Sequence, residues 1–546
     1  KVKSAQLSAT YKHHTTPAWT EMSAELQEAN RKHFAGEYWD GSMPESAKRL
    51  REPLQSPWPG HIVLETTIPK VAAWSAETPA LYTLRIELIN PAGQVVEVSQ
   101  QKIGFRSVVV KGRDLLVNGK RVFIYGVNRH DFNRHTGRVL SREDMRQDLL
   151  EMKRWNFNAV RTSHYPNDAA FLELCDELGF YVIDEANIES HAYYDSISND
   201  SRYASAFVER VGRMVQRDMH HPSVIFWSLG NESGVGTNHY AAAAFARSLD
   251  TSRPLHYEGA INGDWRGGHA LTDVICPMYS SIKAIVSHAK SGKQDRPLIL
   301  CEYSHAMGNS NGTLKEYWDA IHSLPGLQGG FIWEFWDHGI EQTLPDGTKR
   351  SAYGGDFGET RHDGNFVCDG MVFPDRTPKP AMHEFKAIAA PVAFTSTKAA
   401  TGNFTITNRQ FFKDLAGFGC TWTITRDGEV IDGGTLKLPN LAPQKSAKVR
   451  IASKLLTKID GPGERFITFS LFNLHRTDWA PAGHEVAYQQ FALASRKATL
   501  SSAATSDLFE GAVDDAGEIQ LPFGLVAPQP SLWRAPTDND RIAHFA

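Results

Sequence analysis

Between residues 121 and 390, short apolar runs alternate with amphipathic helical patterns, and this rhythm constrains the fold more than any other feature. Short continuous apolar runs are typical of strands buried in a parallel sheet, where helices make the connections. Eight such units favour a (β/α)8 TIM barrel, a fold that normally occupies about 250 residues. The apolar runs are 121–130, 157–166, 180–189, 223–232, 254–260, 273–279, 297–305 and 329–337.

The connections between these runs favour the same fold. Helical patterns fill residues 141–155, 170–179 and 313–324. Ser141 is suited to cap the first of these helices, and Gly179 to end the second. The fifth connection, 261–272, has no helical pattern, so one unit of the barrel is expected to be irregular. An open doubly wound sheet is the alternative, but its usual Gly-rich phosphate turn is missing from this sequence.

The flanking regions have β patterns of another kind. The barrel is predicted over 111–390, after an immunoglobulin-like β-sandwich at 1–110 in which 81–89 alternates like a half-buried strand. Residues 10–60 interrupt this sandwich as an insertion of unknown role. A second sandwich is expected at 391–495, and 496–546 reads as the start of a truncated third β domain. Turn residues predict tight turns at Asn118-Gly119, Asp427-Gly428 and Gly433-Gly434.

Charge and composition argue against several classes of partner. The formal net charge of −4 gives no electrostatic reason to expect nucleic acid or an anionic membrane as a partner. The sequence has no apolar run long enough to span a bilayer, and its first residues have no signal-peptide core, so a cytoplasmic location is expected. Five widely spaced cysteines favour reduced thiols. The first residue is Lys rather than Met, which suggests a fragment.

Polar side chains gather where the apolar runs end, which is where a barrel builds its active site. Glu232 ends the fourth run and Glu302 the seventh, so the two carboxylates should face each other across the barrel mouth. Two facing carboxylates suit glycoside hydrolysis, although either one alone could be a solvated strand-end acid. Four other strand-end acids are more typical of salt-bridge partners: Asp184, Glu185, Glu258 and Glu334.

Histidines at the same ends leave two readings open. Glu189 and His191 are two residues apart, so in extended chain they point to the same side. The pair could hold a divalent cation, Mg²⁺ rather than Zn²⁺, or could simply share a hydrogen bond. Likewise His130, His164 and His305 could pack or cap, or could bind sugar hydroxyls.

Several motifs resemble glycoside hydrolase family 2 and its large lac-type β-galactosidases. Those motifs are GVNRHDFN (126–133), NAVRTSHYP (158–166), VIDEANIESH (182–191), WSLGNESGVGTNH (227–239), CEYSHAMGNSNG (301–312) and the segment 351–380. The resemblance runs from about residue 60 to residue 390, and LWRAPTDND (532–540) resembles the opening of the family's last domain.

The resemblance implies a role for each matching residue. Glu302 would be the nucleophile and Glu232 the general acid/base. The other implied residues are Arg161 and Tyr279 beside the nucleophile, Asn231 on the sugar 2-hydroxyl, His130, His164 and His305 on other hydroxyls, and Trp333 as a stacking wall.

The resemblance also implies cofactors and partners. Glu189, His191 and Glu232 would hold Mg²⁺, and the carbonyl of Phe366 with Asp369 would help to hold Na⁺. The family motif has Asn where this sequence has Asp369, so the affinity for Na⁺ could differ. The substrate would be a β-galactoside, and the full-length protein would be a homotetramer. The family's N-terminal jelly-roll domain and most of its last domain have no counterpart in this sequence.

The resulting prediction is a retaining β-galactosidase that acts on lactose-like substrates. Retention requires the two carboxyl groups to be about 5 Å apart, whereas inversion needs roughly 6.5–9.5 Å. A relative acting on glucuronides or mannosides stays open, although the only strand-end cations are Arg129 and Arg161. An inactive or complementation-dependent fragment also stays open. A metallohydrolase barrel is less favoured, because only His191 has a clear carboxylate neighbour.

Overall fold

The computed structural model describes residues 11–13, 62–64, 66–457 and 463–496. The chain divides into two units, 1–71 and 72–546. In the first unit, β1 (Tyr11–His13) pairs antiparallel with β2 (Ile62–Leu64). Most of the predicted 10–60 insertion and nearly all of the predicted 496–546 segment lie outside the described residues.

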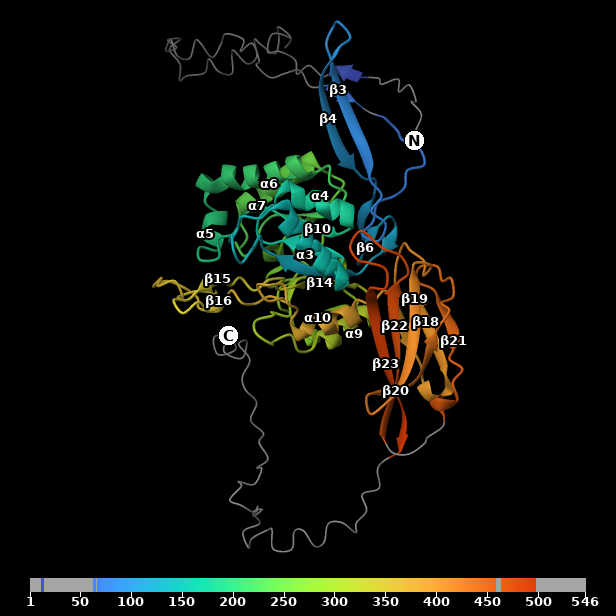
Figure 1. The fold of residues 1–546 in the computed structure, drawn as a ribbon. Helices are drawn as coiled ribbons and strands as arrows, with labels where there is room; N and C mark the ends of the chain where they lie inside the picture. Colours follow the sequence, from blue (N-terminus) through green and yellow to red (C-terminus); the bar gives the residue numbers. More distant parts are fainter. Residues whose placement is uncertain (1–10, 14–61, 65, 458–462, 497–546) are drawn as a thin grey trace, which may run out of the picture. The chain divides into compact units, whose positions relative to one another are not determined.

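The second unit contains a parallel sheet with the strand order β12-β11-β10-β9-β8-β14-β13, of which β10 and β14 are labelled in Figure 1. Its strands are β8 (Ile124–Arg129), β9 (Ala159–Thr162), β10 (Tyr181–Glu185), β11 (Val224–Ser228), β12 (Leu255–His256), β13 (Leu298–Tyr303) and β14 (Leu327–Ile332). Seven of the eight predicted runs therefore form strands of one curled sheet, and the TIM-barrel prediction is confirmed.

The sixth predicted strand, 273–279, is reduced to single bridges with β13. Pro277 lies in the middle of this run and has no N–H for a regular ladder, which explains the interruption. The segment still connects the two ends of the sheet. The Asp273 N–H donates to the Leu255 carbonyl on β12 (2.9 Å), and the Tyr279 N–H donates to the Glu302 carbonyl on β13 (2.8 Å).

Helices follow most of the strands and bury one face against the sheet. They are α3 (Arg142–Arg154), α4 (Ala169–Leu178), α5 (Asp195–Ser198), α6 (Ala204–Asp218), α7 (Thr237–Leu249), α8 (Ile282–Lys290), α9 (Leu314–Ser323) and α10 (Pro380–Ile388). Ser141 caps α3 in a capping box with Asp144, and Gly179 ends α4 with a positive φ of 78°, both as predicted. The fifth connection contains only the short 3-10 helix η3 (Glu258–Ile261), so its predicted irregularity is confirmed.

Strand alternation decides which side chains reach the barrel mouth. On β9, Ala159 packs in the cluster that the strands share with β5 and β6, whereas Val160 packs on the helix side. Arg161 is two residues beyond Ala159 and so points inward. The same spacing turns Glu185 inward after Ile183 on β10. Apolar side chains thus fill the barrel below, and polar ones occupy its carboxyl end.

A three-stranded antiparallel sheet precedes the barrel. Its strands are β5 (Val108–Lys111), β6 (Asp114–Val117) and β7 (Lys120–Arg121). Asn118 and Gly119 both have positive φ, 47° and 72°, which confirms the predicted tight turn. Before this sheet, β3 (Tyr82–Ile89) and β4 (Val95–Ile103) form a separate hairpin.

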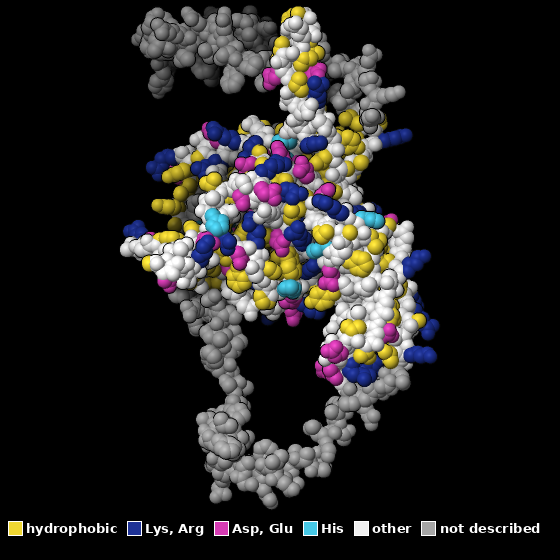
Figure 2. Space-filling view, in the orientation of Figure 1, with side chains coloured by type: hydrophobic (Ala, Val, Ile, Leu, Met, Phe, Trp, Pro, Cys, Tyr) yellow, Lys and Arg dark blue, Asp and Glu magenta, His cyan; other side chains and the backbone are white. Residues whose placement is uncertain are grey.

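The predicted strand at 81–89 exists, but its half-buried character is wrong. Seven of the eight side chains of β3 are exposed, including Leu84, Ile86 and Leu88. A two-stranded ribbon cannot bury a face by itself, and no second layer over β3 and β4 is found among the described residues. Figure 2 shows the resulting apolar side chains along this hairpin, and basic and acidic side chains intermingled over the rest of the face in view.

The region after the barrel is a β-sandwich. One sheet contains β17 (Val392–Thr395), β18 (Asn403–Asn408) and β21 (Ser446–Arg450). The other contains β19 (Phe418–Arg426), β20 (Glu429–Thr435), β22 (Gly463–Asn473) and β23 (Glu485–Arg496). Asp427-Gly428 forms the predicted turn. Gly433-Gly434 does not: both lie inside β20, where the lack of a Cβ at Gly434 makes room for the Trp422 ring.

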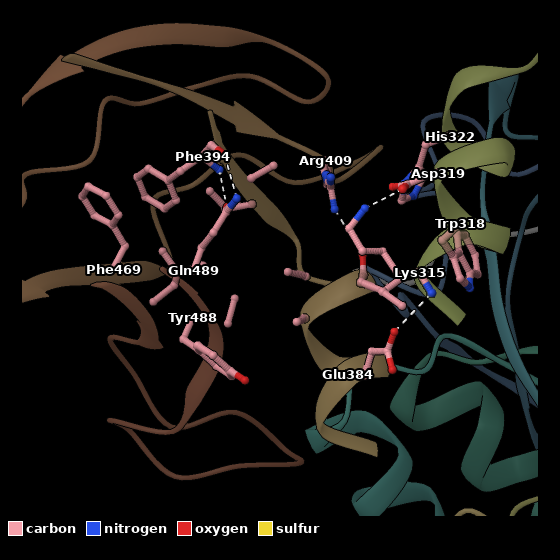
Figure 3. Close-up of a pocket in the computed structure, with 17 residues that line it drawn as sticks. Lys315, Trp318, Asp319, His322, Glu384, Phe394, Arg409, Phe469, Tyr488 and Gln489 are labelled. Atoms are coloured by element: carbon pink, nitrogen blue, oxygen red, sulfur yellow. Dashed lines mark hydrogen bonds and ion pairs between the residues drawn. The ribbon is translucent and has the colours of Figure 1, made fainter. Parts of the chain in front are cut away.

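A cavity of about 260 Å³ lies between α9, α10 and this sandwich (Figure 3). Its polar groups are largely paired with one another. Lys315 bonds Asp319, and Gln489 exchanges two hydrogen bonds with the Phe394 backbone. The cavity is therefore a packing gap between domains, away from the polar strand ends. None of the helices among the described residues is both long and apolar enough to span a membrane.

Candidate active site

Arg161 is the centre of the polar cluster at the barrel mouth. Its buried guanidinium donates to both oxygens of Glu185 (2.8 and 3.0 Å) and to Glu302 Oε1 (2.8 Å). It also donates to the amide oxygens of Asn128 (3.0 Å) and Asn231 (2.7 Å). One fixed fork thus orients four side chains from four different strands or strand ends, in the manner that suits arginine and not lysine.

Glu302 is held at both carboxylate oxygens. Arg161 donates to Oε1, and the Tyr279 hydroxyl donates to Oε2 at 2.8 Å. The side chain is only 6% exposed. The β13–β14 register shifts between Leu300 and Tyr303, and such an irregularity can re-aim a side chain. Glu302 lies in this interval, at the carboxyl end of β13, where its side chain is held by Arg161 and Tyr279.

Glu232 has a different environment. Its side chain is 37% exposed, and its backbone has a left-handed φ of 37° just beyond β11. The Glu232 N–H donates to Glu258 Oε1 at 2.7 Å, which fixes the backbone at this position. Burial, and after it the negative charge of Glu302, raise the pKa of Glu232. A carboxyl group with a raised pKa is suited to donate a proton.

Sequence reasoning assigned no catalytic role to Asn128, Glu185 or Glu258. Glu185 is indeed a salt-bridge partner, since Arg161 offsets its burial and lowers its pKa to about 2. Glu258 was predicted to be one as well, but no ion pair of Glu258 is found among the described residues, and burial raises its pKa to about 8. It acts as a neutral anchor for the Glu232 backbone. In the sequence, only the position of Glu258 after the fifth predicted strand could have indicated this anchoring role.

Predicted sugar-binding residues line one side of Glu302. The His164 ring stacks on the Trp333 indole, with centroids 5.1 Å apart and planes 8° apart. His130 meets both rings edge-on, at 5.6 and 5.7 Å. His305 lies 6.0 Å from the Tyr279 ring. The structure thus brings these predicted sugar-binding residues together beside Glu302.

The surroundings of His164 and His130 shift their pKa values in opposite directions. Burial tends to discharge His164, but its 2.7 Å hydrogen bond with Glu185 more than compensates and raises its pKa. In contrast, burial and then the neighbouring His338 and His164 hold the pKa of His130 well below its usual value. Burial thus favours the neutral form of His130, and the hydrogen bond with Glu185 favours the protonated form of His164.

The three predicted Mg²⁺ ligands lie near one another beside Asn231. His191 Nε2 is 3.9 Å from Glu232 Oε2, and the Asn231 amide donates to both Glu189 oxygens at 3.2 and 3.3 Å. All three side chains are partly or largely exposed, so an ion there could keep water ligands, as Mg²⁺ prefers. The donor types fit the ion, but within the described residues no three such groups are gathered closely enough to form a ready cluster. Mg²⁺ binding stays a prediction.

The predicted Na⁺ ligands lie behind Trp333. Asp369 Oδ2 accepts the Trp333 indole N–H at 3.0 Å and lies 3.5 Å from His305 Nε2. Its other oxygen is buried without a hydrogen-bond donor, an arrangement that a cation would satisfy. Burial, and then the adjacent Glu334, raise the pKa of Asp369 well above its usual value. Na⁺ binding also stays a prediction.

Comparison with known proteins identifies the family. Residues 108–394 match the description "Glycosyl hydrolases family 2, TIM barrel domain". The chain belongs to glycoside hydrolase family 2. Two further matches cover its flanks: residues 2–106 match "Glycosyl hydrolases family 2", and residues 404–494 match "Beta-galactosidase, domain 4".

Individual relatives carry the same family assignment. A "Beta-galactosidase" of Priestia megaterium is 38% identical over 512 residues, covering 88% of this chain and 49% of the relative. A "Beta-galactosidase 2" of Enterobacter cloacae is 40% identical, covering 80% of this chain and 43% of the relative. The chain spans about half the length of the curated relatives it matches. Among solved structures, a β-glucuronidase from Ruminococcus gnavus is 24% identical, with a TM-score of 0.48 and coverage of 60% and 58%.

Proposed function

We propose that the chain carries the catalytic centre of a retaining β-galactosidase that releases terminal β-galactose from lactose-like substrates. The observation that supports this proposal is that the two carboxyl groups have different surroundings. Glu302 is buried and bonded at both oxygens, to Arg161 and to Tyr279, whereas Glu232 is half-exposed with a raised pKa. A retaining glycosidase needs this division between nucleophile and acid. The family and the names of its relatives suggest the sugar.

The first step forms a covalent intermediate. A Glu302 oxygen attacks the anomeric carbon while the bond from that carbon to the leaving oxygen breaks. The Glu232 carboxyl group gives its proton to that oxygen, so the aglycone departs as a neutral alcohol. Arg161 and Tyr279 hold Glu302 in the attacking orientation and prevent its rotation away from the sugar.

The second step reverses these roles. Glu232, now ionised, takes a proton from water as the water oxygen attacks the anomeric carbon, and Glu302 leaves. Two inversions give a product with the starting configuration. Asn231 is bonded through its oxygen to Arg161, which leaves its amide N–H₂ directed toward Glu189 and the pocket, where a sugar hydroxyl can bind.

The wall residues provide groups that can bind the sugar. One face of the Trp333 indole stacks on the His164 ring, so its other face is the one that could pack on the apolar side of a pyranose, and His164 could hydrogen-bond a sugar hydroxyl. Glu189, His191 and Glu232 would hold Mg²⁺, whose charge would lower the pKa of an adjacent carboxyl group. Asp369 and the Phe366 carbonyl would help to hold Na⁺.

The test is a substrate panel with product analysis. We expect the chain to hydrolyse 4-nitrophenyl β-galactoside faster than the β-glucuronide or β-mannoside, with and without added Mg²⁺. Proton NMR of the first product should show β-galactose, which later mutarotates. First appearance of α-galactose would reject the double displacement, and a wild type with no galactosidase activity would favour the inactive or complementation-dependent fragment.

One observation favours a second candidate, a hydrolase of β-uronides. Sequence reasoning found no spare cation near the sugar, but Arg138 donates to the Tyr165 hydroxyl at 2.8 Å and lies 3.3 Å from His130. A guanidinium there could bind a sugar carboxylate. Preference for the glucuronide in the same panel, lost in Arg138→Met, would support this candidate over the galactosidase.

A further inference from the structure

We propose that Tyr193 and Tyr194 form the leaving-group side of the pocket, where their rings bind the sugar or aryl aglycone. The inference rests on the proposed function and deepens it. Both tyrosines are exposed, Tyr193 at 67% and Tyr194 at 43%. They follow the strand-end residue His191 by two and three positions. Two adjacent exposed aromatic residues at the rim of a barrel site are a candidate binding platform.

The loop that carries them has a defined shape. The N–H groups of Tyr193 and Tyr194 both donate to the Ser190 carbonyl, at 2.8 and 2.7 Å. Tyr194 has a left-handed φ of 43°, a conformation that costs a bulky residue about 1–3 kcal/mol. Such a conformation persists only where the surroundings impose it, and it is concentrated at functional sites.

Contacts with the loop after Glu232 impose this shape. Asp195 Oδ1 accepts the Val235 N–H at 2.8 Å. Gly234 lies so close to the same oxygen that an added Cβ would be 1.8 Å from it. The Tyr257 hydroxyl donates to the Gly234 carbonyl at 2.6 Å, which holds that loop from the other side. The tyrosine loop and the Glu232 loop are thus fitted to each other.

The position of Tyr194 relative to the acid follows from its neighbours. Its hydroxyl accepts from the Asn262 amide at 2.9 Å. After partial burial, the charges of Glu258, Asp195 and Glu232 raise the pKa of Tyr194, so its phenol lies within the field of Glu232. His191, on the same loop, is 3.9 Å from Glu232.

Glu232 therefore has two kinds of neighbour. Neighbours of the first kind, Glu302 and the Trp333–His164 wall, surround the place of the reacting sugar. Neighbours of the second kind belong to the 191–195 loop. The acid must protonate the oxygen that joins sugar and aglycone. A group near Glu232 but apart from Glu302 and the wall is accordingly placed to contact the aglycone. Tyrosine suits this task, because its face packs on the C–H side of a pyranose or on an aryl ring while its hydroxyl stays hydrated.

The first test separates aglycone binding from galactose binding. We expect Tyr193→Ala and Tyr194→Ala each to weaken binding of phenyl β-thiogalactoside by up to about tenfold, with free galactose unchanged, as measured by isothermal titration calorimetry. Tyr194→Phe should retain most of the affinity. Tyr240→Ala, which removes a tyrosine of similar exposure (48%) from outer helix α7, is the matched control. Equal affinities in all variants would overturn the inference.

The second test uses turnover. Once galactose is attached to Glu302, either water or glucose can accept it. Of these two acceptors, only glucose has to bind on the aglycone side of the pocket. The alanine variants should yield a several-fold lower ratio of transfer to hydrolysis with added glucose, at unchanged rates of hydrolysis of the galactosyl-enzyme. An unchanged ratio would contradict the inference.

The two tests also separate this inference from the proposed function. Ligand binding requires no catalysis. A wild type that binds phenyl β-thiogalactoside and galactose without hydrolysing galactosides would therefore refute the proposed function. The ratio of the two affinities in the variants would still show whether the tyrosines bind the aglycone. Unfolding midpoints within about 1 °C of the wild type would show that the exposed tyrosines are not needed for folding. A collapse of the fold in Tyr193→Ala and Tyr194→Ala but not in Tyr194→Phe would mark Tyr194 as structural and count against the inference.

Discussion

The surroundings of Glu302 and those of Glu232 differ in almost every physical respect. Glu302 is buried, bonded at both oxygens and part of a charge network centred on Arg161. Glu232 is half-exposed, anchored through its backbone to Glu258, and raised in pKa by burial and by the charge of Glu302. The first environment fixes a carboxyl group beside a cation, and the second raises the pKa of a carboxyl group. The comparison shows how one barrel mouth can prepare one carboxylate to attack and the other to donate a proton.

The largest expected effect comes from removing the anchored carboxylate. Glu302→Gln keeps the shape of the side chain but removes the attacking anion, so kcat should fall by about 10⁴-fold or more. With Glu302→Ala, added azide should restore some turnover by occupying the vacated face and should give α-galactosyl azide. Activity near that of the wild type in Glu302→Gln would contradict the role of Glu302 as the nucleophile.

Removing the acid should have a smaller effect that depends on the substrate. Glu232→Ala should slow lactose hydrolysis by about 10²–10⁴-fold, because the sugar leaving group needs a proton. A dinitrophenyl galactoside needs none, so formation of the galactosyl-enzyme from it should change little in a stopped-flow burst. Azide should here give the β-azide, the opposite anomer from that expected with Glu302→Ala. An equal loss for both leaving groups would contradict the acid role.

The network around Glu302 can be tested through stability. Arg161→Met leaves Glu185 and Glu302 buried without their cation, and the free energy of unfolding should fall by roughly 3–5 kcal/mol. Urea denaturation measures this change. The control is Arg213→Met, whose side chain is 80% exposed and pairs with Glu209; it should cost at most about 1 kcal/mol. Similar losses in both variants would mean that the network contributes little.

The smallest expected effect is a change in acid sensitivity. In the folded state the pKa of Glu185 is lowered to about 2, whereas in the unfolded chain it is about 4.5. Ionised Glu185 therefore stabilises the folded state above pH 4.5, and this contribution is lost as the pH falls from about 4.5 toward 2. Glu185→Gln should flatten this part of the stability–pH curve, measured by urea unfolding at several pH values. Glu232→Gln should not flatten it, because the pKa of Glu232 is raised.

Local patterns predicted the fold well where one element determines its own structure. Ser141 and Gly179 end their helices as expected, and Asn118-Gly119 forms its turn. The errors concern neighbours in space. Gly433-Gly434 looked like a turn, but it is a strand fitted to the Trp422 ring. Burial of β3 depends on what covers it, which alternation alone does not contain.

The candidate site shows the same limit. Motifs and strand ends identified Glu232, Glu302 and the residues around them, and the structure brings them together. Sequence reasoning did not distinguish Glu185, the last residue of β10, from Glu258, which lies just beyond β12. Arg161 faces Glu185 and keeps it ionised, whereas Glu258 receives only a backbone N–H and becomes neutral. Such differences arise from contacts between strands distant in the sequence.

The close fit of Gly234 against Asp195 separates positions that can vary in this protein from positions that cannot. Any side chain larger than hydrogen at 234 would displace both loops and move Glu232 with them. The side chains at positions 193 and 194, by contrast, are exposed and stand on a backbone that is already fixed. Selection or protein engineering could therefore exchange these two side chains to suit new leaving groups while the proton donor keeps its place.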